Sequence, residues 1–454
     1  MIETTIEKIA ELCGGSMNQA AQARKDEMIR GVSIDTRTLE KNNLFVPFKG
    51  ENADGHRFIQ QAFDLGAALS LTEQAVEDGN QDLPLIHVED GLRALQDIAQ
   101  GYLEAVSPKV VAITGSNGKT TTKDMVECLL SPHFKVKKTI GNYNNEIGLP
   151  LTILQLDRDT EISILEMGMD AKGDIRFLSR MTTPDIAILT NVGESHIEKL
   201  GSRENIAHAK YEIVDGLGKN GTFIYSRDYP LLEGIVDRSA NYNIRTAGQN
   251  AENDLQVANV RQTPDGTRFE LLPMKVDVGI PQLGTHNAAN ASLALLAAEA
   301  LGLDIREAKK HFEKLVVTDM RMERVHHKSG ATIINDAYNA SPTSMKSALD
   351  TVGRMEAGRR ILVLGDILEL GSYSEPLHQS IAQHINDSGH GYDYLFTFGD
   401  ASKIIHDYAD IEVKQHHDDI ESLADALQHV MTEDSVILLK GSRGMALERV
   451  IGHI

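Results

Sequence analysis

Short runs of consecutive apolar residues alternate, along the central part of the chain, with windows in which apolar positions recur every three or four residues. The apolar runs cover residues 110–114, 162–166, 186–191 and 223–225. Runs of this length predict strands, and the windows between them predict helices. Strands that alternate with helices predict a doubly wound, mostly parallel sheet.

The same alternation returns after about residue 318. Strands are predicted at 332–335, 360–364, 394–398 and 435–439, and helices at 341–353, 376–387 and 420–431. Three of the strands run into polar loops, at Gly365, Gly399 and Lys440. This pattern predicts a second, smaller unit of the Rossmann type.

A first unit precedes both sheets. It contains a predicted helix at 6–13, a strand at 43–50 and a helix that opens at Asp54 and runs to about residue 66. A chain of 454 residues is long for one core. We therefore predict an α/β protein of three domains: a small N-terminal domain (1–84), a central domain with a phosphate loop (85–317) and a C-terminal Rossmann-like domain (318–454).

Composition and charge narrow the classes of partner. The chain is 41% hydrophobic and 24% charged, and no stretch approaches the roughly 20 apolar residues of a membrane span. Its first residues do not form a secretory signal, so a cytoplasmic protein is expected. A net charge of −21 argues against nucleic acid or an anionic membrane as the main partner. Cys13 and Cys128 lie far apart in predicted helices, where core thiols are expected rather than a disulfide.

The strongest motif follows the first central strand and reads Thr114-Gly115-Ser116-Asn117-Gly118-Lys119-Thr120-Thr121. Glycines let the backbone approach an anion, the start of the next helix offers free N–H groups, and Lys119 supplies a positive charge. The Thr120 hydroxyl could hold Mg²⁺. The full phosphate-loop pattern would have glycine at position 113, where the chain has isoleucine. The strand, loop and helix setting nevertheless favours a phosphate site over an ordinary turn.

Several polar residues follow the other central strands. Glu166 is placed to bind Mg²⁺ or orient water, because hard cations prefer oxygen ligands; the alternative is a carboxylate that caps a helix. His196 lies just past a strand, where a ligand role and a structural role are both open. Lys210 lies on a predicted helix. Its spacing on the helix indicates no role by itself, and on the residues alone a surface position is favoured.

Other candidates surround the hinge between the second and third domains. Asn287 and Asn290 share one helix face and could read a base edge, although capping of that helix is equally consistent. Arg321 could grip phosphate and Asp336 could accept from ribose hydroxyls. In the first domain, Arg37 and Lys49 lie near strand ends, where either ligand binding or a solvated surface is possible.

Taken together in their order, these motifs resemble those of the ATP-dependent Mur ligases, which add amino acids to the peptide stem of the bacterial cell-wall precursor. The resemblance spans nearly the whole chain. The matching positions are Thr114 to Thr120, Glu166-Met167-Gly168, His196, Lys210, His286-Asn287 with Asn290, Arg321-Met322-Glu323, and Asp336-Ala337-Tyr338-Asn339-Ala340-Ser341-Pro342.

The resemblance implies roles for individual residues. The ATP-binding set would be Gly115, Ser116, Asn117, Gly118, Lys119, Thr120, Thr121, Asn287, Arg321 and Asp336. Thr120 and Glu166 would bind one Mg²⁺, and His196 with a carbamylated Lys210 a second, which makes Lys119, His196 and Lys210 the catalytic group. Uridine diphosphate would lie near Ser33, Asp35, Thr36, Arg37, Lys49 and Gly50. Asn339, Ser442 and Arg443 would lie near the peptide substrates.

Within the family, the resemblance is closest to the branch that joins D-alanyl-D-alanine to UDP-N-acetylmuramoyl-tripeptide, as a monomer using ATP and Mg²⁺. The features are Asp336-Ala337-Tyr338-Asn339-Ala340, the run from Gly365 to Gly371, and Lys440-Gly441-Ser442-Arg443-Gly444. The ligation implied proceeds through an acyl phosphate that closure of the third domain, about a hinge near 317–319, keeps from water.

Three alternatives stay open. The sister ligase that adds a diamino acid would be expected to show Asp-Asn-Pro-Arg and Gly-Lys-Gly-His-Glu, and neither string occurs. A ligase of glutamates to folate shares the central architecture, but the uridine-like segments of the first domain argue against it. An NTP-driven switch would have no use for a second metal site. The segment with His416 and His417 is expected to be a solvated loop and has no assigned role.

Overall fold

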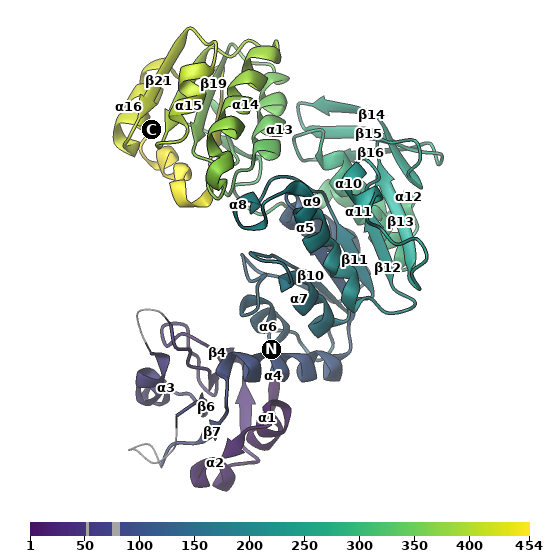
Figure 1. The fold of residues 1–454 in the computed structure, drawn as a ribbon, viewed down its shortest axis with the longest axis vertical. Coiled ribbons are helices and arrows are strands. Elements are labelled where there is room, and N and C mark those ends of the chain that lie inside the picture. The colour runs from purple at the N-terminus through teal and green to yellow at the C-terminus, as the bar shows by residue number, and fades with distance from the viewer. Residues whose placement is uncertain (51–53, 75–81) are drawn as a thin grey trace.

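The computed structural model describes residues 1–50, 54–74 and 82–454. Three α/β domains follow one another along the longest axis of the molecule, from the N-terminal domain at the bottom of Figure 1 to the C-terminal domain at its top. This arrangement and the mostly parallel sheets confirm the predicted fold class.

The N-terminal domain holds two small sheets. One pairs β1 (Glu3–Thr5) with β3 (Met28–Arg30); the other has the order β2 (Ser16–Met17), β7 (Leu85–His87), β6 (Leu69–Thr72), β5 (Leu44–Phe45) and β4 (Val32–Ser33). Its helices are α1 (Ile6–Cys13), α2 (Gln19–Ala23), the 3₁₀ turn η1 (Gly55–Phe58) and α3 (Ile59–Asp64). Because β7 belongs to this sheet, the first domain extends past residue 84. The long helix α4 (Gly91–Val106) then leads into the central domain.

A nine-stranded sheet forms the central domain. Its order is β16 (Val276–Ile280), β15 (Gly266–Leu272), β14 (Leu255–Thr263), β13 (Asn243–Gly248), β12 (Thr222–Tyr225), β11 (Ile186–Leu189), β8 (Lys109–Thr114), β10 (Ile162–Glu166) and β9 (Val136–Lys138). The strands from β14 to β9 run parallel, and β15 and β16 add an antiparallel extension. The phosphate-loop strand β8 is thus an interior strand with parallel neighbours on both sides.

Helices cover this sheet: α5 (Lys119–Leu130), α6 (Gly148–Ile153), α7 (Asp174–Thr182), α8 (Ile197–Leu200), α9 (Arg203–Tyr211), α10 (Pro230–Glu233), α11 (Asn287–Ala300) and α12 (Ile305–Ala308), with 3₁₀ turns η2 (Glu212–Gly216) and η3 (Lys309–Lys314). The apolar helix α11 packs beside α5, and both bury aliphatic side chains against strands β8, β10 and β11. This core fixes the start of α5 at the carboxyl ends of the parallel strands, where ligands of such sheets bind.

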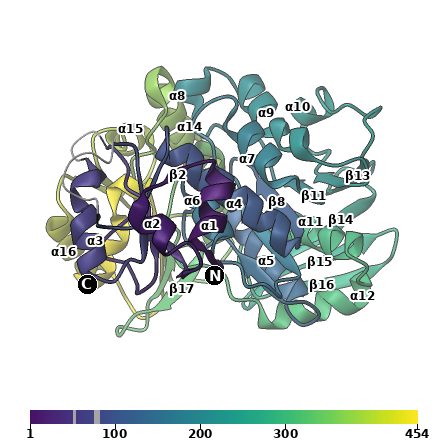
Figure 2. The same ribbon diagram turned by 90° about the horizontal axis from the view of Figure 1, so that it is seen from below.

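The C-terminal domain has a six-stranded sheet in the order β17 (Glu323–His326), β18 (Thr332–Asn335), β22 (Ser435–Lys440), β19 (Arg359–Gly365), β20 (Tyr394–Phe398) and β21 (Val413–His417). All neighbours are parallel except β17. Around it lie α13 (Pro342–Gly353), α14 (Ser374–Asp387), α15 (Lys403–Tyr408), α16 (Ile420–Val430) and 3₁₀ turns η4 (Gly371–Tyr373), η5 (Arg443–Met445) and η6 (Leu447–Gly452). From below, α16 and the β14–β16 extension lie at opposite sides of the molecule (Figure 2).

The linker into the C-terminal domain is fastened to the central domain. The backbone N–H and the hydroxyl of Thr318 both donate to Oδ2 of Asp124, at 2.9 and 2.8 Å. Asp124 is buried on α5, and its Oδ1 accepts from Lys138 at 2.7 Å. The hinge is therefore anchored on the helix that starts at the phosphate loop.

Three local predictions need correction. The predicted strand at 43–50 is only Leu44–Phe45, because Pro47 lacks the N–H that a longer ladder requires. The helix expected from 54 onward is split into η1 and α3. His416 and His417 are not in a loop: they end β21, an edge strand whose polar sequence fits a half-exposed position.

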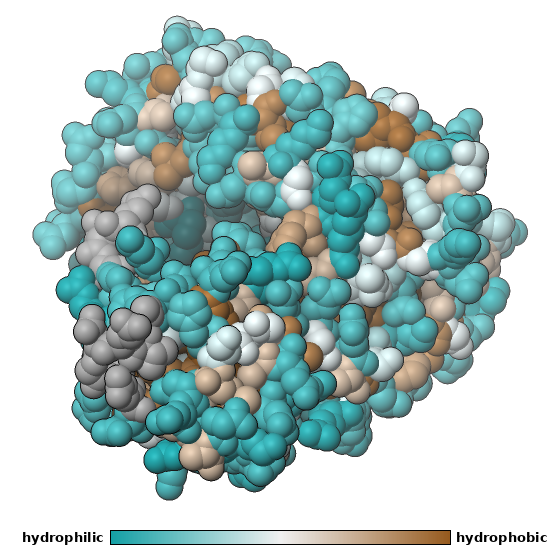
Figure 3. Space-filling model, turned by 60° about the horizontal axis from the view of Figure 1, so that its bottom comes forward, coloured by the Kyte–Doolittle hydropathy of each residue, from teal (hydrophilic) through white to brown (hydrophobic). Residues whose placement is uncertain are grey.

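Within the described ranges, no helix is long and apolar enough to cross a membrane. The face shown in Figure 3 is largely hydrophilic, and its apolar residues are scattered. Cys13 and Cys128 are both free and partly buried.

Candidate active site

A cavity of about 870 Å³ lies between the central and C-terminal domains. The central domain contributes the phosphate loop, Glu166, His196 and the start of α11, and the C-terminal domain contributes Arg321, Asp336 and the start of α13. The cavity is lined by the following predicted residues: Ser116, Asn117, Gly118, Lys119, Thr120, Thr121, Glu166, His196, Asn287, Arg321, Asp336 and Asn339. Positions far apart in the sequence thus meet in one space.

The loop between β8 and α5 has the close packing that its glycines permit. Gly115 has a φ of 152°, and a Cβ there would lie 1.8 Å from the Thr190 hydroxyl. Gly118 has a φ of 78° and precedes the first residue of α5. The Asn191 side chain accepts from the N–H of Asn117 at 2.9 Å and holds the loop in place. The first N–H groups of α5 therefore point into the cavity without intrahelical partners, as an anion site requires.

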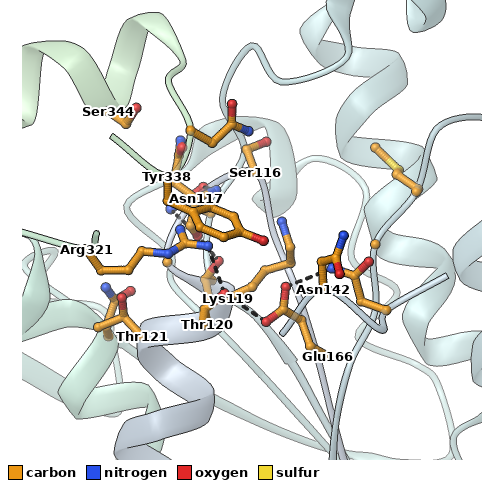
Figure 4. Close-up of a pocket in the computed structure, with 18 of the residues that line it drawn as sticks. Ser116, Asn117, Lys119, Thr120, Thr121, Asn142, Glu166, Arg321, Tyr338 and Ser344 are labelled. Atoms are coloured by element: carbon orange, nitrogen blue, oxygen red, sulfur yellow. Dashed lines mark hydrogen bonds between the residues drawn. The ribbon is translucent and has the colours of Figure 1, made fainter. Parts of the chain in front are cut away.

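A buried carboxylate faces the first turn of α5. Oε2 of Glu166 accepts from the Thr120 hydroxyl at 2.9 Å, and Oε1 accepts from the Asn144 amide at 2.9 Å. Lys123 Nζ lies 3.8 Å from the same carboxylate. Figure 4 shows Thr120 beside Glu166. A carboxylate and a hydroxyl side by side form an oxygen-rich pair that suits a hard divalent cation.

One partly buried lysine, Lys119, lines the cavity, and a second, Lys210, is buried near it. Nζ of Lys119 donates to the carbonyl of Gly115 at 2.9 Å, and burial lowers its pKa. Lys210 is 2% exposed on α9, and burial, with the nearby charge of Lys119 as a smaller cause, lowers its pKa well below the usual 10.5. The surface role that the residues alone favoured for Lys210 is therefore wrong. Lys210 does not line the cavity itself.

His196 is the N-cap of α8 and has a left-handed conformation, with a φ of 64°. Its Nδ1 lies 2.9 Å from Oε2 of Glu369 in the C-terminal domain and 3.7 Å from Asp170. The contact with Glu369 has the distance of an ion pair, but not the angle of a hydrogen bond.

The C-terminal domain approaches the phosphate loop through Arg321. Its guanidinium lies 4.1 Å from the centre of the Tyr338 ring and donates to the Thr120 hydroxyl at 3.0 Å. Figure 4 shows Arg321 between Tyr338 and Thr120. Asp336 is held by Lys440, whose Nζ lies 2.5 Å from Oδ2, and by the N–H of Met322. Both side chains are therefore held in place by contacts within the protein.

The two asparagines of α11 engage each other. Nδ2 of Asn287 donates to the Leu283 carbonyl at 2.7 Å, and its Oδ1 accepts from Asn290 at 2.8 Å. Asn287 therefore already uses one donor and one acceptor, which leaves one hydrogen of its amide for a ligand. Neither residue serves as the N-cap of the helix, which is His286.

Other predicted residues lie away from the cavity. In the N-terminal domain, Arg37 forms an ion pair with Asp35 at 2.6 Å, and the Ser33 hydroxyl donates to the Asp35 carbonyl. In the C-terminal domain, the Ser442 hydroxyl accepts from the N–H of Leu368, and Arg443 pairs with Glu448. The remaining members of the predicted substrate set, Thr36, Lys49 and Gly50, are likewise in the N-terminal domain.

Three residues that hold site side chains in place were given no individual role from the sequence. Asn144 orients Glu166, Tyr338 stacks on Arg321, and Lys440 fixes Asp336. Asn144 could have been found from three asparagines in the segment 142–145 that follows β9, a strand that continuous apolar runs did not reveal. The Lys440 pairing joins β22 to the loop after β18 and depends on tertiary structure alone.

Among the described residues, no three His, Cys, Asp or Glu side chains form a metal-binding group. Glu166 and Thr120 offer Mg²⁺ two adjacent oxygens, and the phosphates of a nucleotide would supply further ligands, as is usual for this ion. The first predicted magnesium site thus fits the residues present.

Three family models match the chain: the Mur ligase middle domain over residues 113–298, the glutamate ligase domain over 320–443 and the Mur ligase family catalytic domain over 28–103. A UDP-N-acetylmuramoyl-tripeptide--D-alanyl-D-alanine ligase of Bacillus subtilis (strain 168) is 42% identical, over 99% of this chain and 98% of its own.

Solved structures of MurF are also similar to this chain over most of its length. MurF from Acinetobacter baumannii is 25% identical with a TM-score of 0.88, covering 100% of this chain and 98% of that one. MurF ligase from Thermotoga maritima in complex with ADP is 30% identical with a TM-score of 0.83, covering 93% and 96%. A 2,6-diaminopimelate ligase and a folylpolyglutamate synthase, each 16% identical, share the fold alone.

Proposed function

The chain belongs to the Mur ligase family, and from that premise we propose that it joins D-alanyl-D-alanine to UDP-N-acetylmuramoyl-tripeptide with cleavage of ATP to ADP and phosphate. The relatives that carry this name match the chain from end to end, and one of the similar structures holds ADP. We further propose that the protein acts as a monomer in the cytoplasm, in the synthesis of the peptidoglycan precursor, and so bears on cell shape and division.

The observation that carries the proposal is the divided cavity. One wall is a phosphate loop, and the opposite wall brings Arg321 and Asp336 from another domain. A nucleotide-driven switch needs the first wall only. A ligase must also shield a reactive intermediate from water, which a closing domain can do.

The mechanism uses few groups of the protein. ATP phosphorylates the terminal carboxylate of the tripeptide, and the amine of D-alanyl-D-alanine then displaces phosphate to form the amide. Such transfers depend on positioning and charge neutralisation. In this proposal the N–H groups of α5 and Lys119 orient the β- and γ-phosphates, Arg321 and Asp336 hold the nucleotide from the other side, and Asn287 contacts adenine.

Mg²⁺, when bound, would neutralise phosphate charge. Thr120 and Glu166 would hold one ion, and His196 with a carbamylated Lys210 a second. The burial of Lys210 supports this modification. A lowered pKa raises the fraction of the buried amine that is uncharged, and only the uncharged amine can attack CO₂, forming an N–C bond and releasing a proton. The product is an anionic oxygen ligand.

We propose two further binding sites, one for the stem peptide and one for uridine diphosphate. Asn339 lines the cavity and would contact the peptide substrates, as would Ser442 and Arg443, which lie outside the cavity lining. Ser33 to Arg37 and Lys49-Gly50 would hold uridine diphosphate in the N-terminal domain. Arg37 is 87% exposed at its side chain, so its guanidinium is accessible to a phosphate.

The decisive experiment measures phosphate release from ATP with UDP-N-acetylmuramoyl-tripeptide, with and without D-alanyl-D-alanine. Release that requires both substrates supports the proposed ligation. Release that occurs only with the dipeptide precursor and a diamino acid would instead assign the reaction of the sister Mur ligase. Release that depends on folate would assign a ligase that adds glutamates to folate. For Lys210, ¹³C-bicarbonate should give a carbamate NMR signal that Lys210→Ala abolishes.

A further inference from the structure

The loop between β19 and η4 brings a carboxylate of the C-terminal domain to His196. Glu369 Oε2 lies 2.9 Å from His196 Nδ1, a ring nitrogen that is shielded from solvent and has no hydrogen bond. The other ring nitrogen, Nε2, has no recorded partner among the described residues, and His196 lines the cavity. The carboxylate therefore faces Nδ1 and leaves Nε2 for another partner.

Both residues of this pair have strained backbones. His196 has a φ of 64° and Glu369 a φ of 61°, a region that side-chain-bearing residues seldom occupy. Such conformations cost on the order of 1–3 kcal/mol each and persist where the surroundings enforce them, often at functional sites. Here one strained residue from each domain presents its side chain to the other.

Glu369 extends from a fixed base. The three residues before it are each held: the Asp366 carboxylate accepts from the N–H of Ser402, Ile367 donates to His378, and Leu368 donates to the Ser442 hydroxyl. The carboxylate is consequently pre-positioned by the C-terminal domain, not by the central domain that carries His196.

The loop docks on the central domain beside the pair. The Tyr373 hydroxyl donates to the Gly201 carbonyl at 2.7 Å, and the N–H of Glu198 donates to the Glu369 carbonyl at 3.4 Å. A Cβ at Gly371 would lie 2.8 Å from Glu198. The position of Glu369 relative to His196 thus depends on closure of the two domains.

We propose that Glu369 is a positioning residue: on closure its carboxylate engages Nδ1 of His196, which fixes the Nδ1–H tautomer and directs Nε2 into the cavity as a metal ligand. Metal-binding histidines commonly donate their second N–H to a carboxylate, which sets ring orientation and basicity. The inference rests on the proposed function of His196. It adds that the second metal site is completed only by the closed C-terminal domain.

The test compares Glu369→Ala and Glu369→Gln with Tyr373→Phe, which removes a docking contact of the same loop without touching His196. ¹⁵N NMR of the metal-free protein, with His196→Ala to assign the signal, reports the tautomer. Titration with Mn²⁺, followed by electron paramagnetic resonance with ADP and bicarbonate present, reports metal affinity. Neither readout depends on turnover.

We expect the wild type and Tyr373→Phe to show the Nδ1–H tautomer, and Glu369→Ala to lose it. Mn²⁺ should bind Glu369→Ala about 10–100-fold more weakly at one site, the range typical of lost partners of metal ligands. Glu369→Gln, whose amide oxygen can still accept, should recover part of the affinity. The ligase kcat should fall while the KM for the peptides stays unchanged.

An unchanged tautomer or unchanged Mn²⁺ affinity in Glu369→Ala would overturn the inference, and so would equal weakening in Tyr373→Phe, which would reduce the loop to a docking contact. A wild-type protein that does not ligate D-alanyl-D-alanine would contradict the proposed function instead. The role of Glu369 would still be tested by the His196 tautomer and the Mn²⁺ titration, which do not depend on ligation.

Discussion

Replacing Arg321 with alanine should impair the use of ATP more than any other single change in the C-terminal wall of the cavity. The guanidinium stacks on Tyr338 at 4.1 Å and donates to the Thr120 hydroxyl at 3.0 Å, and so joins the two domains across the phosphate loop. A cation–π contact contributes about 0.5–2 kcal/mol. A hydrogen bond from a charged donor contributes about 1.5–3 kcal/mol.

Because the two contributions are not fully additive, we expect the substitution to cost about 2–4 kcal/mol in total. At about 1.4 kcal/mol for each factor of ten, kcat/KM for ATP should fall by roughly 30- to 1000-fold. Initial rates of phosphate release at saturating peptide substrates measure this value. Arg321→Lys keeps the charge but loses the planar fork, and should recover only part of the loss.

A matched control and a cycle sharpen the test. Arg324 also reaches the central domain, through the Pro264 carbonyl at 2.7 Å, but lies outside the cavity, so Arg324→Ala should leave ATP use nearly unchanged. A double-mutant cycle with Tyr338→Leu should give a coupling of about 0.5–2 kcal/mol. Unchanged KM and kcat in Arg321→Ala would refute closure onto the nucleotide.

Three further predictions follow from the same structure. Lys119→Ala and His196→Ala should each lose most ligase activity while circular dichroism stays native; wild-type turnover in either variant would contradict its role. Asp124→Ala removes a buried carboxylate that accepts hydrogen bonds from Thr318 in the hinge, and should lower the free energy of unfolding, measured by urea titration, by about 3–5 kcal/mol. The control Asp157→Ala removes a half-exposed carboxylate and should lower it by less than about 1 kcal/mol. Burial lowers the pKa of His378 from 6.5, so the folded protein binds fewer protons than the unfolded chain and loses stability as pH falls from about 6.5 through the folded pKa. The urea midpoint of the wild type should therefore fall between pH 7.5 and 5.5, and it should fall less in His378→Gln. An equal fall in both proteins would exclude His378 as the cause.

The sequence predicted best the parts of the fold whose signals are local. Strand β8, the glycine loop and α5 are specified by one continuous stretch of about 20 residues, and the other buried parallel strands are continuous apolar runs. Strand β16 alternates buried and exposed residues instead, and β14 and β15 are interrupted by polar positions. Continuous runs do not detect such strands, so the antiparallel extension was not predicted.

Within the site, residue types on strand ends were enough to nominate Glu166 and His196, since parallel strands present their carboxyl ends at one edge. Their partners were not predictable in the same way. Glu369 meets His196 and Thr120 meets Arg321 across a domain boundary, so these contacts depend on how two separately folded sheets are placed. Burial of Lys210 likewise depends on tertiary structure, and it excludes the surface position that the sequence alone favoured.

The hydrogen bonds between Thr318 and Asp124 have a consequence for the kinetics of site assembly. A linker fastened to the phosphate-loop helix holds the C-terminal domain within a short distance of its partner surface, at an effective concentration in the millimolar range or above. Formation of the complete site is then a unimolecular step whose rate does not depend on protein concentration. Most of the translational entropy of bringing Arg321 to Thr120 is lost once, when the chain folds, and not in each catalytic cycle.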